Sequence, residues 1–533
     1  MKNKKKILLL LSFMLLGLLL RLNNLGQRSL WTDEFFTLFQ ATGHGQDLVE
    51  FLESLSHKQP PELLKASDFT LFLQNSPNRT IENVNKSILL VDTYPPLYFW
   101  LMHFWMKLIG DSALAIRLFS FLLGLFAIYL AYKVSFYLFD ENTALFSAFF
   151  TSISAFAVRY SQEARSYSLI TVLVLLSSLF LMRFEKKRKN RDILVYSLMN
   201  CLGIYTHYFY IFIAFAQFIY FTYVYRNETL ILRKFYLAFI CSILLFFPWF
   251  SLLMSKGYNF YLTEWLFGFP GIWNKFYYLL SGFIRYFLII DNQSPMIRFS
   301  ALLGSCLFIY LVWVTIKETA VKYGKQLKGD GRGLWQMRDR QQTFFPLMLL
   351  AVPIIGMFSM DIVLHGTVLR QERFWTFSFP GFMLLVSPIL SFAFVRKRNY
   401  ALVFILCMLI MSISISRMQF GPAPKDICHW IKIESKGESV AVIVINARGV
   451  VCAQAYYLDK DMYLIPVSDD TQLQEAVSEL SRRVNKIFLA RHYHPTDNAL
   501  LNRGFMETRS IGNGFRLAAT VNRDSISVSE FLK

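Results

Sequence analysis

Charged side chains beside long apolar runs are the residues of this chain that could do chemistry, because charge near a bilayer is costly to keep. They come from six separate places in the 533-residue sequence. These residues are Asp33, Glu34, Asp92, Arg117, Arg159, Glu163, Arg165, His207, Glu372 and Arg373. If the fold brings the segments together, they form one polar site with candidate bases and phosphate-binding cations.

The acidic residues allow two interpretations. Asp33 and Glu34 follow the first apolar run and stand among aromatic residues. A carboxylate at that place could be a general base for an acceptor hydroxyl or a metal ligand. Alternatively, Thr32 or Asp33 could cap a helix, because such side chains satisfy the free N–H groups at a helix N-terminus and suit its dipole. Asp92 precedes a stiff Pro-Pro turn and could also be a cap.

The segment from Arg159 to Tyr167 carries two arginines and one acid between two apolar runs. Arginine binds phosphate with fixed geometry, so Arg159 and Arg165 could hold a phosphate group. Alternatively, both arginines reach lipid headgroups, and Glu163 neutralises one of them. The sequence alone leaves both interpretations open.

His207 and Arg373 also lie at the boundaries of apolar runs. His207 stands between aromatic residues and could belong to an interfacial aromatic belt, and Arg373 could be a membrane anchor. The chain has no metal-ligand spacing of Cys or His, and no phosphate loop or dinucleotide fingerprint. A cytosolic nucleotide donor is therefore not supported.

The elements that must position these residues are membrane helices. Hydrophobic residues make up 55% of the chain and charged residues only 17%, against about 25% charged in an average soluble domain. With 25 Gly, 16 Pro and 6 Cys, fibrous, disordered and disulfide-framework classes are excluded. The net charge of +19 need not indicate nucleic acid, because cytoplasmic loops of membrane proteins are rich in Lys and Arg.

Near-uncharged runs predict a polytopic all-α membrane protein with about 11 spans. The runs are 7–20, 118–132, 142–158, 166–182, 193–225 (two spans with a turn at His207), 235–255, 299–316, 343–360, 374–395 and 399–416. With the N-terminus inside, the basic segments 183–192, 226–234, 317–342 and 396–398 become cytoplasmic. Residues 94–109 and 272–290 are predicted to be interfacial helices. The first run is predicted to be a retained helix, since no small-x-small cleavage site follows it.

Two domains follow from this assignment. Residues 1–416 form the membrane domain, which includes an outer loop at 22–117 with amphipathic helices. Residues 417–533 alternate strand-like runs with a helical one, which predicts a small extracytoplasmic α/β domain. The strand-like runs are 439–445, 462–467, 486–490 and 514–521, and the helical run is 472–484.

Over about residues 1–420, the order of these motifs resembles the GT-C membrane glycosyltransferases. The closest likeness is to glycosyltransferase family 39, the protein O-mannosyltransferase-like group, and to the related lipid A aminoarabinose transferases. The motifs are Asp33-Glu34, Asp92-Thr93-Tyr94-Pro95-Pro96-Leu97, Gly110-Asp111-Ser112, Arg117-Leu118, Ser161–Tyr167, Tyr205-Thr206-His207-Tyr208, Pro248-Trp249 and Arg373 with Pro380. Tyr94 is a departure, because these families have His or Lys there. Residues 417–533, here called the tail, do not resemble the β-trefoil of eukaryotic protein mannosyltransferases.

The resemblance implies an inverting glycosyltransferase at the outer face of the cytoplasmic membrane. A monosaccharide would move from a polyprenyl-phosphate donor to a lipid, glycan or protein acceptor. Asp33 would be the base, with Glu34 or Asp92 as second carboxylate. The cations for the leaving phosphate would be Arg117, Arg159, Arg165 and Arg373. Residues contacting the substrate would be Tyr94, Gln162, Glu163 and His207. Whether a divalent Mg or Mn ion assists stays open.

Two other functions stay open at this stage. A secondary transporter would place charges at mid-membrane and show internal repeats, whereas here the notable charges gather at one predicted face. A non-catalytic, polyprenyl-lipid-binding subunit of an envelope assembly fits the same sequence features. Nucleic acid is not an expected partner, and neither the sugar nor the acceptor is identified by the sequence.

Overall fold

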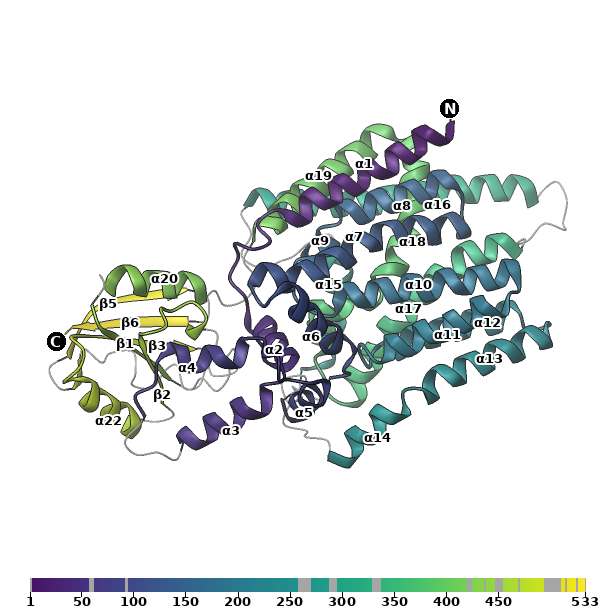
Figure 1. Ribbon diagram of the computed structural model, residues 1–533. Coiled ribbons are helices and arrows are strands. Elements are labelled where there is room, and N and C mark those ends of the chain that lie inside the picture. Colours follow the sequence, from purple (N-terminus) through teal and green to yellow (C-terminus); the bar gives the residue numbers. More distant parts are fainter. Residues whose placement is uncertain are drawn as a thin grey trace. The chain divides into compact units, whose positions relative to one another are not determined.

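The chain folds into two compact units, as the computed structural model shows. It describes residues 2–56, 62–91, 94–256, 270–286, 295–327, 337–418, 424–435, 438–445, 454–467, 470–492, 510–512, 515–523 and 526–532. Unit 1 comprises Met1–Leu25, Thr93–Tyr98 and Arg117–Arg417, and unit 2 comprises Gly26–Asp92, Phe99–Ile116 and Met418–Lys533. Unit 1 holds the long apolar helices, and unit 2 holds a β-sheet and several short helices (Figure 1).

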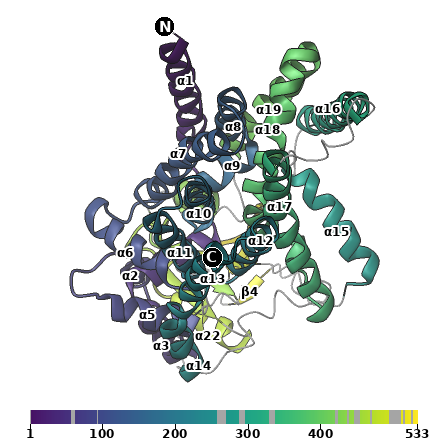
Figure 2. The same ribbon diagram turned by 90° about the vertical axis from the view of Figure 1, so that its right-hand side faces the viewer.

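Unit 1 is built almost entirely from helices. They are α1 (Lys2–Leu22), α7 (Ala113–Leu138, whose first turn belongs to unit 2), α8 (Glu141–Ile153), α9 (Ala155–Ser161), α10 (Tyr167–Lys187), α11 (Asn190–Ile204), α12 (Tyr210–Val224), α13 (Thr229–Leu244), α14 (Phe247–Lys256), α15 (Ile272–Arg285), α16 (Pro295–Leu327), α17 (Met337–Val363), α18 (Phe379–Arg396) and α19 (Arg398–Arg417). Two short 3₁₀ helices, η3 (Val368–Arg370) and η4 (Glu372–Phe377), connect α17 to α18. Figure 2 views several of these helices end-on, so their axes run in broadly the same direction.

Seven helices in the described part of the chain are long and apolar enough to cross a membrane. They span Ala113–Leu138, Tyr167–Lys187, Thr229–Ser255, Ile297–Glu318, Gln342–Val363, Phe379–Arg396 and Arg398–Arg417. The predicted multi-pass helical class is therefore confirmed, while the count of eleven spans stays a prediction. The predicted break at His207 is also present, because α11 ends at Ile204 and α12 begins at Tyr210.

Helix α10 lies at the centre of unit 1, where it contacts α11, α12 and α18. In the most apolar stretch of α10, 78% of the residues are buried, against 22% for the span Thr229–Ser255. The latter exposes large apolar side chains such as Leu244 and Phe247. An exposed face of this kind suits contact with lipid, because water would not tolerate so large an apolar surface.

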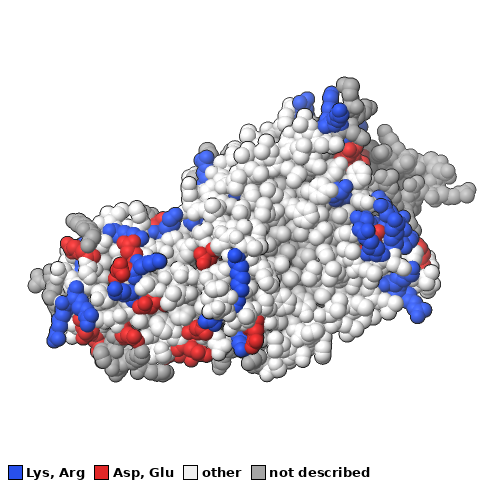
Figure 3. Space-filling model, in the orientation of Figure 1, with Lys and Arg blue, Asp and Glu red and all other residues white. Residues whose placement is uncertain are grey.

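Charge on unit 1 gathers at the end of the helices that carries the α10–α11 and α12–α13 turns (Figure 3). The exposed basic residues in these turns are Lys186, Lys187, Arg188, Lys189, Arg191, Arg226, Arg233 and Lys234. The visible face between this end and the opposite end of the helices is largely uncharged (Figure 3). This pattern is the one expected of a helix bundle in a bilayer.

Unit 2 contains the helices of the outer loop and the sheet of the tail. The outer-loop helices are α2 (Thr32–Thr42), α3 (Gly45–Ser56), α4 (Ala66–Thr70), η1 (Leu71–Leu73), α5 (Ile81–Val91) and α6 (Leu97–Ile109, whose first two residues belong to unit 1). Helix α6 covers most of the segment predicted as interfacial. Helix α2 ends at Gly43, whose φ of 81° is the left-handed conformation that favours glycine.

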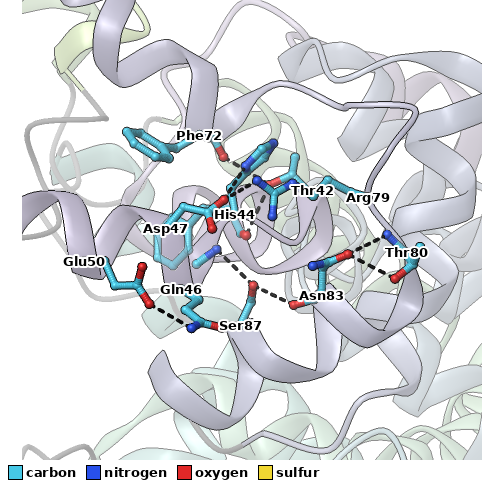
Figure 4. Close-up of polar contacts among 12 residues, drawn as sticks. Thr42, His44, Gln46, Asp47, Glu50, Phe72, Arg79, Thr80, Asn83 and Ser87 are labelled. Carbon is cyan, nitrogen blue, oxygen red and sulfur yellow. Dashed lines mark hydrogen bonds and ion pairs between the residues drawn. The ribbon is translucent and has the colours of Figure 1, made fainter.

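A polar cluster joins α3 to α5 and to the turn that precedes α5 (Figure 4). The Asp47 carboxylate contacts both His44 Nδ1, at 3.1 Å, and the Arg79 guanidinium. The Gly45 N–H donates to Ser87 Oγ at 2.9 Å. Because Gly45 begins α3 three residues after α2 ends at Thr42, these contacts hold the chain just beyond the C-terminal end of α2.

The tail forms one mixed sheet. Its strands are β1 (Val440–Ile445), β2 (Tyr463–Val467), β3 (Lys486–His492), β4 (Ser510–Gly512), β5 (Phe515–Arg523) and β6 (Ile526–Leu532), in the order β2-β1-β3-β6-β5-β4. Strands β2, β1 and β3 are parallel, and the others pair antiparallel. Helix α22 (Asp470–Leu480) packs on one face through a core that includes Ile443, Ala476 and Leu489. Helix α20 (Pro424–Ser435) contacts β3 through Trp430 and Phe488. The predicted α/β fold of the tail is confirmed, while its boundary at 416/417 as a separate domain stays a prediction.

Candidate functional site

Most of the residues that the sequence selected belong to unit 1. Those in unit 1 are Tyr94, Arg117, Arg159, Gln162, Glu163, Arg165, His207 and Arg373. Asp33 and Glu34 belong to unit 2, and Asp92 lies outside the described residues. The roles of all these residues stay predictions, but their surroundings indicate what each can do.

Arg159 is the centre of an ion-pair network. Its Nε donates to Glu163 Oε1 at 3.2 Å, and its Nη1 donates to the carboxylate of Glu372. All three side chains are largely buried, with exposed fractions of 13%, 3% and 18%. The network joins the 155–163 segment to η4, although Arg159 and Glu372 are 213 residues apart. Two acids therefore offset the charge of Arg159, which suits a residue that positions the site.

Arg21, which the sequence did not single out, supports the same segment from α1. It is fully buried, and its Nη atoms donate to the carbonyls of Thr151 and Ser152 at 2.9 Å. These carbonyls end α8, where helices leave acceptors free and favour a cation. Arg21 Nε donates in addition to Ser161 Oγ at 3.1 Å.

Gln162 and Arg117 contact the end of α1 and the residues just after it. The Gln162 side-chain amide donates to the carbonyls of Arg21 and Asn23, both at 2.9 Å. The Arg117 guanidinium donates to the Leu25 carbonyl at 2.9 Å. Both side chains thus satisfy backbone acceptors at the point where α1 ends.

His207 sits in a buried aromatic box between α11 and α12. The rings around it are those of Tyr94, Phe209, Phe374 and Phe377, with centroid distances of 4.9–5.7 Å. Its Nδ1 accepts the backbone N–H of Phe209 at 3.1 Å. The imidazole proton of the neutral ring must therefore reside on Nε2. Within the described residues, Nε2 is buried and has no hydrogen-bond partner.

The charge state of His207 is fixed by its neighbours. Burial, with the positive charges of Arg165 and Arg373, lowers the pKa of His207 to about 3. The ring is neutral at physiological pH and presents one N–H donor. A buried donor of this kind calls for an acceptor, because a polar group left unsatisfied in the interior is costly. Since the nearby charges are positive, the acceptor that fits best is an anion.

Tyr94 contacts both Arg165 and His207. The Arg165 guanidinium carbon lies 5.4 Å from the Tyr94 ring centroid, in the range of a cation–π contact. The Arg165 side chain is buried, and its carbonyl accepts the Ser120 hydroxyl at 3.2 Å. Tyr94 therefore lies against both a guanidinium and the His207 ring, at the position where the predicted families have a basic residue.

The segment that carries Arg373 is held by α15 and α17. Asp361, fully buried near the end of α17, accepts the backbone N–H groups of Val368 at 2.6 Å and Leu369 at 2.9 Å. Lys275 of α15 donates to the Asp361 carbonyl. These contacts order the turn ahead of Arg373, and no local pattern in the sequence predicts them.

Helix α15 and the residue after it, Tyr286, also contact the segment that follows this turn. Arg285 donates to the Arg370 carbonyl, and the Tyr286 hydroxyl contacts Ser378 Oγ at 2.6 Å. Trp375 lies edge-on to Tyr286 at 5.8 Å between ring centroids. The predicted interfacial segment 272–290 thus contains a helix that packs on the Arg373 segment.

Asp33 and Glu34 occupy the first turn of α2 in unit 2. Glu34 is fully buried, and its Oε2 accepts the Trp31 N–H at 3.2 Å. The start of α2 is thus capped through Glu34, whereas the sequence had indicated Thr32 or Asp33 as the cap. Asp33 is half-buried. No group of three or more His, Cys, Asp or Glu side chains gathers in a metal-binding arrangement within the residues that the structure describes.

Residues 93–251 match the family model described as dolichyl-phosphate-mannose-protein mannosyltransferase. A comparison with curated protein sequences found no match. The fold is similar to that of ArnT from Cupriavidus metallidurans in the apo state, at a TM-score of 0.54 and 12% identity, over 98% of this chain and 97% of that one. The match extends over both units.

Two further solved structures are more distant. ArnT from the same organism bound to undecaprenyl phosphate gives a TM-score of 0.49 at 13% identity, over 98% and 97% of the two chains. The Archaeoglobus fulgidus oligosaccharyltransferase with Zn and sulfate gives 0.46 at 13% identity, over 90% of this chain and 67% of that one. The family match and the apo ArnT fold confirm the predicted resemblance to GT-C membrane glycosyltransferases.

Proposed function

We propose that the chain transfers a sugar from a polyprenyl-phosphate donor to an acceptor of the cell envelope. The observation that carries the proposal is the buried Nε2–H of His207 among cationic groups. A neutral donor flanked by Arg165 and Arg373 suits a phosphate oxygen, because guanidinium groups bind phosphate and the imidazole adds one directed hydrogen bond. The match of residues 93–251 to a lipid-phosphate-sugar transferase family supports the same donor class.

In this proposal the donor phosphate is the leaving group. An acceptor oxygen forms the new bond to the anomeric carbon while the bond from that carbon to the phosphate oxygen breaks, and the configuration inverts. The electron pair stays on the lipid phosphate, whose charge Arg165, Arg373 and His207 would stabilise. The leaving phosphate is already acidic, so a strong general acid is not needed, unlike in glycosidases.

Asp33 is the proposed base, which takes the proton of the acceptor hydroxyl. Its neighbour Glu34 is fully buried, whereas Asp33 is half-buried at the start of α2. This difference makes Asp33 the better candidate of the pair. Asp92 stays the alternative second carboxylate.

The proposed location is the cytoplasmic membrane, with the N-terminus inside and the tail outside. The basic turns α10–α11 and α12–α13 would then face the cytoplasm, in agreement with the positive-inside rule. Cysteine labelling within 317–342 tests this orientation. Labelling of that loop by an impermeant reagent from outside would contradict it.

The experiment that tests the function uses the full chain in detergent and in membrane vesicles. Undecaprenyl phosphate binding is measured first, and then the release of undecaprenyl phosphate from a panel of undecaprenyl-phosphate-linked sugars in the presence of envelope membranes. We expect Asp33→Asn to bind undecaprenyl phosphate normally and to lose transfer. Wild-type protein that binds the lipid but consumes none of the donors would favour the non-catalytic alternative, and full transfer by Asp33→Asn would exclude the proposed base.

A further inference from the structure

The outer loop and the tail meet just ahead of the acidic pair in unit 2. Every residue from Gln27 to Leu30 has a bond to the tail. The bonds are Lys425 Nζ to the Gln27 carbonyl at 2.5 Å, Arg28 Nη1 to the Met418 carbonyl at 3.1 Å, the Lys425 N–H to Ser29 Oγ at 3.3 Å, and the Leu30 N–H to the Tyr457 hydroxyl at 2.7 Å. The path of the chain into α2 is therefore set by the tail.

Aromatic packing reinforces this junction. Phe35, in the first turn of α2, is almost fully buried. Its ring lies edge-on to Tyr456, at 5.8 Å between centroids, and to Tyr457, at 6.4 Å. Edge-on aromatic pairs stabilise a contact beyond what the buried area alone contributes. Tyr457 thus contacts the chain on both sides of the Asp33–Glu34 pair, through the Leu30 N–H and through the Phe35 ring.

A second contact joins the loop to the edge of the tail sheet. Residue Lys65 forms an antiparallel bridge with Tyr463 of β2. The Leu464 N–H donates to the Leu64 carbonyl at 2.8 Å, and the Ala66 N–H donates to the Met462 carbonyl at 3.0 Å. Because β2 is an edge strand, this pairing covers part of an edge that would otherwise stay open.

The C-terminal end of α2 is held separately. There the contacts come from within the outer loop, through Gly45 with Ser87 and through Asp47 with His44 and Arg79 (Figure 4). Of the two ends of α2, the one that carries the acidic pair is thus the end bound to the tail. This asymmetry indicates that the tail acts on the acidic pair.

We infer that the tail domain positions the acidic pair, with Tyr457 as the positioning residue for Asp33. The inference rests on the proposed role of Asp33 as base. The hydroxyl of Tyr457 accepts the N–H of Leu30, three residues ahead of Asp33, and so fixes where α2 begins. The direction of the Asp33 side chain follows from that start, and a small displacement of a catalytic group is enough to lower the rate about 100-fold.

The adjacent tyrosine provides a matched control. Tyr456 presents its hydroxyl to the N–H of Ala113, at the start of α7, at 3.2 Å. Tyr457→Phe and Tyr456→Phe each remove one hydroxyl and keep the ring against Phe35. Only the first removes the acceptor ahead of Asp33.

The test measures amide hydrogen exchange in the full-length protein together with transfer kinetics. In Tyr457→Phe we expect exchange in the peptide 30–36 to rise about five-fold, since a net hydrogen bond is lost, while Tyr456→Phe leaves that peptide unchanged. We expect kcat in Tyr457→Phe to fall about ten-fold or more, with KM for the undecaprenyl-phosphate-linked sugar within about two-fold. If the tail were only a general scaffold, kcat would instead fall equally in Tyr457→Phe and Tyr456→Phe.

Two outcomes overturn the inference. One is unchanged exchange at 30–36 in Tyr457→Phe, and the other is unchanged kcat in that variant while Asp33→Asn is inactive. Wild-type turnover by Asp33→Asn would overturn the proposed function instead, so the two failures are distinguishable. If Tyr457→Phe does not fold, Lys425→Met, which loses the bond to the Gln27 carbonyl, carries the same expectations.

Discussion

The Nδ1 atom of His207 accepts the backbone N–H of Phe209 at 3.1 Å, and this contact decides what the imidazole offers to a ligand. With Nδ1 occupied, the proton of the neutral ring lies on Nε2, which is buried. The ring can therefore donate one hydrogen bond in a fixed direction. Its surroundings, with Arg165 and Arg373 as the nearby charges, make an anion the matching acceptor.

Replacement of His207 by Phe is expected to weaken undecaprenyl phosphate binding. A hydrogen bond to a charged group contributes about 1.5–3 kcal/mol, so the Kd should rise about ten-fold to 100-fold. His207→Gln keeps an N–H donor and should lose only a few-fold. The Kd of each variant for undecaprenyl phosphate is measured in detergent. His429→Phe serves as control, because His429 is exposed. Equal Kd values for wild type and His207→Phe would contradict the phosphate site.

Acidification is expected to destabilise the fold through His207. The pKa of His207 is lowered from 6.5 to about 3 by burial and the two arginines. Between these values the unfolded chain binds the proton and the folded chain does not. The stabilising contribution is thus fully present above about pH 6.5 and is lost as pH falls towards 3. At pH 5 the loss amounts to about 2 kcal/mol.

Thermal unfolding at pH 7 and pH 5 checks this expectation. His207→Gln should show a smaller loss of stability between the two pH values than the wild type, since Gln does not titrate. The same slope in both proteins would show that His207 is not the titrating group.

The helices and strands of this chain were largely predictable, because apolar runs and alternation are local patterns. The strand-like run 462–467 corresponds to β2 at Tyr463–Val467, and the helical run 472–484 overlaps α22 at Asp470–Leu480. The break at His207 was predictable for the same reason. A run of 33 residues is too long for one span of about 20 residues.

The partners within the site were not predictable, since they come from distant segments. Nothing in the sequence near Arg159 shows that Glu372 neutralises it. Glu372 was among the notable charges but had no assigned role, and its position next to Arg373 was the only signal. Arg21 binds backbone carbonyls and Asp361 binds backbone N–H groups. Because backbone groups of this kind occur all along the chain, no pattern of side chains predicts these two contacts.

Arg159 is expected to matter more for stability than for phosphate binding. Arg159→Met leaves Glu163 and Glu372 buried near each other without the cation between them. Breaking a buried ion pair from one side costs about 3–5 kcal/mol. Arg165→Met should instead reduce undecaprenyl phosphate binding, with a smaller loss of stability.

Thermal stability of a double variant tests this explanation of Arg159. Arg159→Met with Glu163→Gln should recover part of the loss, because one of the two facing acids is then neutral. Lys86→Met, which breaks the exposed pair with Glu82, serves as control and should leave the thermal stability nearly unchanged. If the double variant is no more stable than Arg159→Met, repulsion between the acids is not the cause.

Gly282 of α15 tests whether that helix positions the Arg373 segment. A Cβ atom at Gly282 would lie 1.6 Å from Trp375 Cζ2, so Gly282→Ala must displace the Trp375 ring or the helix. Overpacking of this kind costs about 1–3 kcal/mol. Because Trp375 lies two residues after Arg373, we expect weaker undecaprenyl phosphate binding and lower thermal stability. Gly271, at the start of α15, has nothing within 4 Å of such an atom. Gly271→Ala should therefore match the wild type, and unchanged lipid affinity in Gly282→Ala would show that the Arg373 segment does not depend on α15.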